Sequence, residues 1–287
     1  MTWEQSDETS NPVTDDKQLQ HIFKIENSFA TELSISGKWK NIKGSFKYLS
    51  SKDDAASQAY DDNKANKYLG NIEADFDLFD SSIRYIHTKT SGSSSGYDYE
   101  TQNTSYIEFD TELTIVDMEF FPKIFNNKVF GLGYRYQDYT LPQSIYIIGK
   151  QTLTQRSIET DMNWKSHYIT AVLDTSRYVV DDLKAKNGGF DFYGRAVGGY
   201  AFNVETTGKI VGEAKAGNYL NGDNGYFYEL EAGLIYMHNF DYLTSYLKAG
   251  YRYDYAELET SSDSDVYIYA KATSKYYGPF LTLHIIF

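Results

Sequence analysis

The residues of this sequence that could do chemistry are acids and bases spaced two apart within otherwise apolar segments. Between positions 68 and 78, for example, Glu73, Asp75 and Asp77 alternate with apolar residues such as Ile72. Side chains two apart lie on the same face of a β-strand, so each such segment has one apolar and one charged face. The charged positions assigned to one common face are Glu73, Asp75, Asp77, Glu108, Asp110, Glu112, Arg135, Glu229, Glu231, Lys248 and Arg252.

The composition indicates that strands position these residues. The 287 residues include 28 Tyr and 17 Phe but only 4 Pro and no Cys. Aromatic residues favour strands, and the absence of Cys excludes disulfides and thiolate metal sites. No run of 18 apolar residues is present, so a membrane could be crossed only by strands. A mean hydropathy of −0.53 permits this, because a barrel with a wet interior needs apolar residues only at alternate positions.

The chain ends on an apolar face, formed by Leu281, Leu283, Ile285 and Phe287. This pattern resembles the carboxy-terminal signal of porin-like outer-membrane β-barrels of Gram-negative bacteria. The resemblance implies a place in the outer membrane, and contact with its lipid and lipopolysaccharide. It also implies that the assembly machinery reads the terminal strand through Phe287.

We therefore predict an all-β chain that forms a transmembrane antiparallel up-and-down barrel. Residues 1–18 form a flexible amino-terminal lead and residues 19–287 the barrel. The segments give 12 to 14 strands with 14 favoured, since that leaves about 20 residues for each strand and its connection. Turns are expected at 163–166, 203–205 and 221–225, and a loop at 179–189. Periplasmic turns should be short and extracellular loops long and acidic.

The charged faces are expected to turn inward. Lipid-facing carboxylates cost free energy, so a strand that carries Glu108, Asp110 and Glu112 should point them into a polar lumen. In a wide barrel, rows of both signs line a wet pore that selects solutes by size and charge. In a narrow barrel the same groups pair across the interior and plug it. Outward aromatic residues should form membrane girdles, and those predicted are Trp39, Trp164, Tyr251, Tyr253, Tyr255 and Phe287.

Catalytic motifs are absent from the sequence. The residues two positions after the five His are Phe, Lys, Ile, Phe and Ile, so the His-x-Ser pair of barrel phospholipases is missing. There is no Gly-x-Ser-x-Gly elbow and no His-Glu-x-x-His zinc pair. Only His87 lies near an expected outer rim, where an interfacial role is the simpler interpretation. We expect no enzyme activity, no cofactor and no metal site.

The function predicted from these features is a monomeric outer-membrane pore for passive diffusion of small hydrophilic solutes. A net charge of −13 speaks against binding nucleic acid and favours a mild preference for cations. The alternative is a closed or plugged barrel whose extracellular loops bind a surface partner as an adhesin or receptor. A lipid-modifying enzyme of the outer membrane is a third, weaker alternative.

Overall fold

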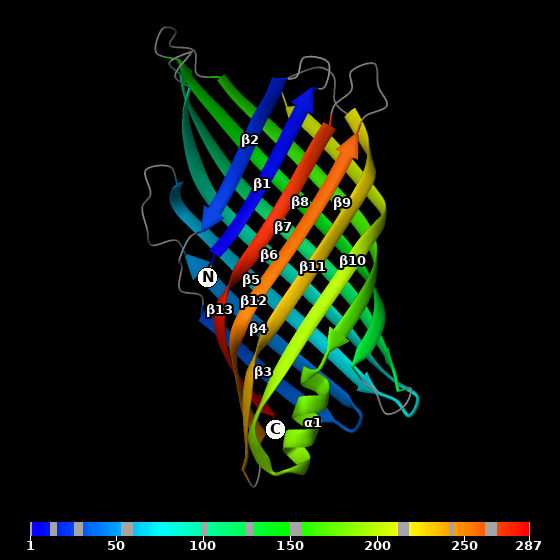
Figure 1. Ribbon diagram of the computed structural model, residues 1–287. Coiled ribbons are helices and arrows are strands. Elements are labelled where there is room, and N and C mark those ends of the chain that lie inside the picture. The colour runs from blue at the N-terminus through cyan, green and yellow to red at the C-terminus, as the bar shows by residue number, and fades with distance from the viewer. Residues whose placement is uncertain are drawn as a thin grey trace.

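The protein forms a tilted β-barrel with one short helix at its lower end (Figure 1). This computed structural model describes residues 2–11, 16–25, 31–52, 60–98, 103–123, 129–149, 156–211, 218–240, 244–261 and 269–286. The wall strands are β3 (Thr31–Trp39), β4 (Ile42–Lys52), β5 (Tyr60–Asp75), β6 (Phe79–Asp98), β7 (Asn103–Pro122), β8 (Phe130–Gly149), β9 (Arg156–Asp174), β10 (Gly188–Val211), β11 (Asn218–Asn239), β12 (Thr244–Ser261) and β13 (Tyr269–Ile286).

Each wall strand pairs antiparallel with the next along the chain, so the topology is up-and-down as predicted. The barrel is nearly closed where β13 meets β3, and these two strands run parallel. Among the described residues they pair at Ile286 and Ser36 alone. Two further strands, β1 (Thr2–Asn11) and β2 (Asp16–Ile25), form a hairpin on β13 farther from this seam. Residues 2–11 thus pair as a strand where we predicted a flexible lead.

The prediction of 14 strands is wrong, because the described wall has eleven strands, β3 to β13. Segments that we interpreted as turns lie inside long strands. In β10 the register shifts between Ala201 and Asn203, and in β11 it shifts between Gly222 and Asn224. The turn-forming residues there produce bulges, which absorb an extra residue without ending the strand. The segment 163–166 likewise continues β9, in register with β8 and β10.

The expected loop at 179–189 is mostly helix α1 (Ser176–Ala185). Its apolar residues Val179 and Leu183 are four apart, so they lie on one face of the helix. The helix ends where Asn187 adopts a positive φ of 62° and Gly188 one of 118°. A side chain at Gly188 would place its Cβ 2.9 Å from the Met237 carbonyl oxygen, so only glycine fits this close approach.

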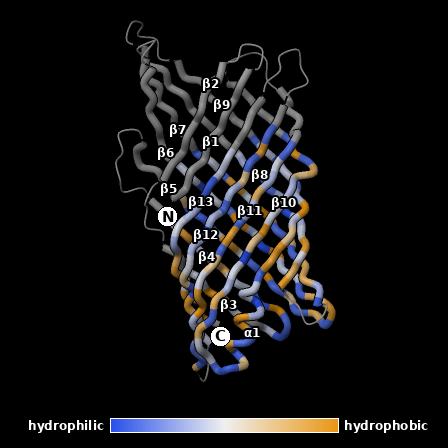
Figure 2. The backbone as a smooth tube through the Cα atoms, in the orientation of Figure 1, coloured by the Kyte–Doolittle hydropathy of each residue, from blue (hydrophilic) through white to orange (hydrophobic). Residues whose placement is uncertain are grey.

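An apolar belt surrounds the lower half of the barrel (Figure 2). On the outer face of β6 and β7 the paired rows Ile83 with Met118 and Tyr85 with Val116 are apolar. The next row is polar, with His87 Nδ1 at 3.1 Å from Thr114 Oγ1. No helix in the described part of the chain is long and apolar enough to cross a membrane.

The outer face of the same two strands continues beyond the belt with charged residues. Lys89 pairs there with Glu112, and Asp110 is exposed one step farther along β7. The prediction that Asp110 and Glu112 line the lumen is therefore wrong. They face outward, but above the apolar belt, where a carboxylate meets water and not lipid.

The belt predicts how the barrel responds to a charge placed on its outer face. Leu132 on β8 is 65% exposed within the belt, and Thr140 lies on the same face beyond it. Leu132→Arg should cost about 2–4 kcal/mol of unfolding free energy and Thr140→Arg about 0–1 kcal/mol, since the cost falls toward the interface. Urea titration of the protein folded into lipid vesicles measures both. Equal costs would show that the belt does not face lipid.

Candidate functional site

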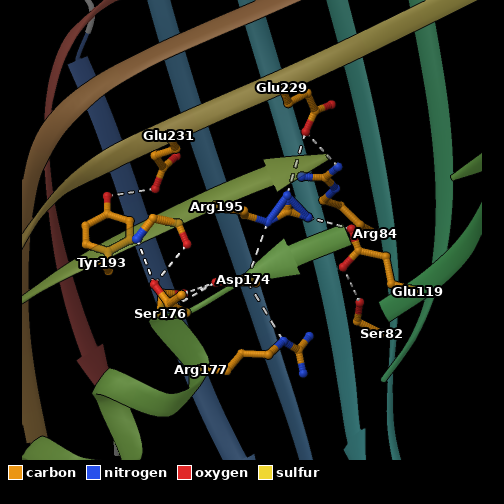
Figure 3. A network of polar contacts seen from close by, with 12 residues as sticks. Ser82, Arg84, Glu119, Asp174, Ser176, Arg177, Tyr193, Arg195, Glu229 and Glu231 are labelled. Carbon is orange, nitrogen blue, oxygen red and sulfur yellow. Dashed lines mark hydrogen bonds and ion pairs between the residues drawn. The ribbon is translucent and has the colours of Figure 1, made fainter. Parts of the chain in front are cut away.

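Six charged side chains form a layer across the barrel interior, which we call the ion-pair layer. Figure 3 labels four of them, Arg84, Glu119, Arg195 and Glu229. Its members are Arg84 on β6, Asp117 and Glu119 on β7, Arg135 on β8, Arg195 on β10 and Glu229 on β11. Alternate residues of each strand point inward, and the phase of these strands turns charged groups toward one another. The layer therefore follows from strand register and not from a local motif.

Short contacts connect these groups around shared carboxylates. Asp117 accepts from Arg135 Nε at 2.5 Å and from Arg84 Nη2 at 2.5 Å. Glu229 lies 2.5 Å from Arg135 Nη2 and 3.2 Å from Arg84 Nη2. Arg195 Nη2 donates to Glu119 Oε1 at 2.5 Å. Charged hydrogen bonds of this length are stronger than neutral ones, so the layer is held firmly.

The layer closes the lumen, because its contacts cross from one wall to the other. Strand β6 is separated from β11 by four wall strands in one direction and by five in the other. The contact between Arg84 and Glu229 thus joins opposite walls of the barrel. Arg135 is only 3% exposed within this layer. Of the two outcomes predicted for rows of mixed charge, the described interior has the paired and plugged one.

Aromatic side chains pack against the layer inside the barrel. The guanidinium of Arg135 lies 3.6 Å from the centre of the Phe227 ring, and Tyr168 meets Phe227 edge-on at 5.2 Å. Trp164 belongs to the same interior cluster and is 2% exposed. The prediction that Trp164 forms part of a membrane girdle is therefore wrong. It was placed beside a turn that does not exist, and β9 turns it inward.

A second group of polar side chains lies on the inner face of three neighbouring strands, β10, β11 and β12. Arg252 on β12 donates to Glu231 on β11 at 2.5 Å, and the Tyr193 hydroxyl donates to the same carboxylate at 2.8 Å. The ammonium of Lys248 lies 4.6 Å from the centre of the Tyr193 ring. This group stays on one side of the barrel, so it narrows the interior without crossing it.

Helix α1 covers the lower mouth from within. Val179 and Leu183 pack on the inward side chains Tyr193, Ile235 and Met237. The turn into the helix is fixed to the wall, since Thr175 N donates to Gly194 O at 2.9 Å and Gly194 N to Thr175 Oγ1 at 2.8 Å. The helix is therefore part of the barrel interior and not a loose connection.

Three cavities follow one another along the part of the interior that the described side chains line. The largest, about 320 Å³, lies between α1 and the ion-pair layer, and we call it the vestibule. Cavities of about 70 Å³ and about 80 Å³ follow it. The vestibule is next to the turns at 40–41 and 76–78, which join β3 to β4 and β5 to β6. Short connections of this kind are expected on the periplasmic side.

Several predicted lumen residues do face the interior, namely Glu73, Arg135, Glu229, Glu231, Lys248 and Arg252. Asp75 is exposed at the lower rim, where its hydrogen bond from Lys123 raises the pKa of that lysine. Asp77 is exposed in the turn that follows, so it does not line the lumen. The Glu108 side chain lies outside what the structure describes.

Most of the predicted girdle residues lie on the outer face. Trp39 is 68% exposed beside the turn to β4, and Tyr251 is exposed on β12. Tyr253 and Tyr255 share the outward face of that strand and stack on Tyr228, at 5.8 Å and 5.1 Å between ring centres. Phe287 lies outside the described residues.

Sequence reasoning missed Asp117, Glu119, Asp174 and Arg195. The first two follow directly after an apolar stretch of β7, and the spacing of two was visible. Their inward direction was hidden by assigning that strand the opposite phase. Asp174 and Arg195 flank a connection that we interpreted as a loop, and they lie 3.5 Å apart.

A wall that is apolar outside and charged within is what a membrane-spanning barrel requires, because closure satisfies the backbone and the interior shelters the charges. The described strands have both features. The chain is an outer-membrane β-barrel. Its location is the outer membrane of a Gram-negative bacterium, as predicted from the terminal segment. Contact with lipopolysaccharide and recognition of Phe287 by the assembly machinery stay predictions.

No protein-family model matches the chain, and no curated protein matches it. Among solved structures, the chain is similar to the CymD monoaromatic hydrocarbon channel, with 9% identity, a TM-score of 0.37 and coverage of 96% of this chain and 87% of that one. For the toluene transporter TbuX of Ralstonia pickettii the identity is 8%, the TM-score 0.35 and the coverage 96% and 88%. For the translocator domain of the autotransporter NalP from Neisseria meningitidis these values are 9%, 0.37, 96% and 87%.

Proposed function

We propose that this barrel is a monomeric pore for small hydrophilic solutes, closed in the present conformation by the ion-pair layer. The observation that carries the proposal is a row of cavities along the interior, each lined in part by charged residues. The vestibule shares Lys47, Arg84 and Arg195 with the cavity of about 70 Å³. That cavity in turn shares Lys67, Glu229 and Asp254 with the cavity of about 80 Å³.

Only side chains separate these cavities. A change of rotamers in the layer can therefore join them without breaking any strand pairing. Both signs of charge occur along the described inner wall, so the wall itself favours neither cations nor anions strongly. The mild preference for cations stays a prediction that depends on the net charge of −13.

Electrical recording from planar bilayers tests the proposal. We expect the native protein to stay closed for long periods and to open briefly, with reversal potentials that favour cations slightly. Loss of the layer should lengthen the openings. Protein that never conducts, even after both the layer and α1 are removed, would exclude a pore.

A second candidate, binding of a surface partner, is favoured by the height of the wall. Strands β6, β7 and β8 each have 20 residues, whereas about 9–11 span a bilayer. Strands β6 and β7 continue past the apolar belt to the outer-face pair of Lys89 and Glu112 and on to the pairing of Asp98 with Asn103. Shortening the β6–β7 hairpin above the pair of Lys89 and Glu112 should abolish attachment of cells to a surface but preserve conductance. We propose no catalytic role for the chain.

A further inference from the structure

We propose that Lys67 and Asp254, which we call the charge pair, bind the two charged ends of a small zwitterionic solute such as a neutral amino acid. The inference rests on the proposed function, since it names the class of solute that the pore retains. Its basis is that both residues line the cavities of about 70 Å³ and about 80 Å³, which we call the upper cavities, and that neither has a direct ionic partner among the described residues.

The cavity of about 80 Å³ shows the charge pair most clearly. The charged side chains that line it are Lys67, Arg135, Glu229 and Asp254. Two of these neutralise each other, because Arg135 Nη2 lies 2.5 Å from Glu229 Oε1. The other two are Lys67 and Asp254. No oppositely charged group of the described residues lies within 4.0 Å of either side chain.

One aromatic ring brings the two charges to the same place. The Lys67 ammonium reaches inward from β5 and lies 5.5 Å from the centre of the Tyr276 ring on β13. Asp254 on β12 is the direct neighbour of Tyr276 across those paired strands. The ammonium and the carboxylate are therefore near the same ring, and each charge acts on the other.

The other charged groups that act on the pair are already held by direct contacts. These groups are Arg84, Glu229 and Arg252. Arg84 donates to Asp117 at 2.5 Å, and Arg252 donates to Glu231 at 2.5 Å. Glu229 is bound within the ion-pair layer. The charge pair is thus the part of this interior that a solute can engage without breaking an existing ion pair.

A solute that carries both charges suits this pair better than a simple ion does. Burying a charge without a direct partner is unfavourable. An anion drawn to Lys67 is repelled by Asp254, and a cation drawn to Asp254 is repelled by Lys67. A zwitterion can place its carboxylate at Lys67 and its ammonium at Asp254. It then compensates both charges at once, through charged hydrogen bonds.

The upper cavities have space for a solute of a few non-hydrogen atoms. A water molecule needs about 10–15 Å³ of such space, so each cavity exceeds the room for one water several times. Ile86 lines both cavities, and Leu113, Ile115 and Phe227 line the larger one. A short apolar side chain would meet apolar surface there, which favours a neutral amino acid over a charged one.

Equilibrium dialysis with radiolabelled glycine tests the site. The full chain is refolded from urea in a non-ionic detergent with glycine present throughout, so the site can fill whether or not the folded barrel opens. We expect the native chain to bind glycine. Lys67→Gln and Asp254→Asn should each bind it at least about tenfold more weakly, the effect of losing one charged contact. Lys165→Gln and Asp110→Asn make the same changes on the outer face and should bind as the native chain does.

Exchanging the two charges separates recognition of a zwitterion from a loss of structure. The variant Lys67→Asp/Asp254→Lys keeps one charge of each sign at the site. A zwitterion can bind there in the opposite orientation, so this variant should bind glycine more tightly than either single variant.

Competition against the native chain needs no variant. Acetate and methylammonium each carry one of the two charges, and they should displace glycine at least about tenfold less effectively than unlabelled alanine does.

Equal glycine binding by the native chain and both single variants would overturn the inference. An absence of binding by the native chain would do the same, as would competition by acetate that equals that by alanine. The slower migration that follows boiling in electrophoresis shows whether each variant is folded. Because binding is measured without any current, a chain that binds glycine but never conducts would contradict the pore alone. A chain that conducts but binds no glycine would contradict the site alone.

Discussion

Replacing Arg135 with Met will lower the free energy of unfolding by about 3 kcal/mol, the lower end of the range for breaking a buried ion pair. The change leaves Asp117 and Glu229 in the interior without the group that lies 2.5 Å from each. Arg84 still contacts both carboxylates, which is why the expected cost is not larger. Urea titration in lipid vesicles measures the difference.

The control for Arg135→Met is Lys89→Met, which removes a base of the same charge from the outer-face pair with Glu112. Both side chains of that pair are about half exposed, so water replaces the lost contact and no measurable change is expected. If the two variants are equally stable, the ion-pair layer is hydrated like a surface and does not hold the barrel closed.

Sequence reasoning could predict the strands whose outer face stays in one environment, the lipid, along the whole segment. On β11 and β12 the outward side chains stay within the belt, and Tyr226 to Tyr236 alternate correctly with Glu229 and Glu231. The terminal strand behaves in the same way, with Leu281 and Leu283 outward. Membrane location and barrel class follow from such segments alone.

Strand β7 shows why the direction of the other charged side chains could not be predicted from the alternation of apolar and charged residues. Its outward face is polar at Asp110 and Glu112 and apolar at Met118 and Phe120, while its inward face carries Asp117 and other charged residues nearer the lower end. A strand of 20 residues leaves the bilayer halfway along, so the apolar face changes sides. A single phase fitted to residues 107–115 is therefore inverted for the charged groups.

The ion-pair layer was hidden for a different reason. Arg84 and Glu229 are 145 residues apart, and their contact depends on the number of strands and on the tilt that closes the barrel. An error of three strands changes which side chains face each other across the lumen. The segments 163–166, 203–205 and 221–225 contributed to that error, because the residue types that occur there also form turns.

Removing the pair of Arg135 and Glu229 together should open the pore. The variant Arg135→Ala/Glu229→Ala leaves the net charge of the interior unchanged, and the contacts of Arg84 with Asp117 and of Arg195 with Glu119 remain. Glu229 lines both upper cavities and Arg135 lines one of them, so their truncation joins the two. In planar bilayers we expect resolved single-channel steps that last far longer than the openings of the native protein.

A matched pair separates this effect from a general loosening of the interior. Arg252→Ala/Glu231→Ala removes the same two chemical groups from neighbouring strands β12 and β11, at a contact of the same 2.5 Å length. That contact does not cross the lumen, so this variant should stay closed like the native chain. Conduction by both variants would mean that any loss of interior volume opens the barrel. Silence in both would locate the barrier elsewhere, with α1 at the lower mouth as the next segment to remove.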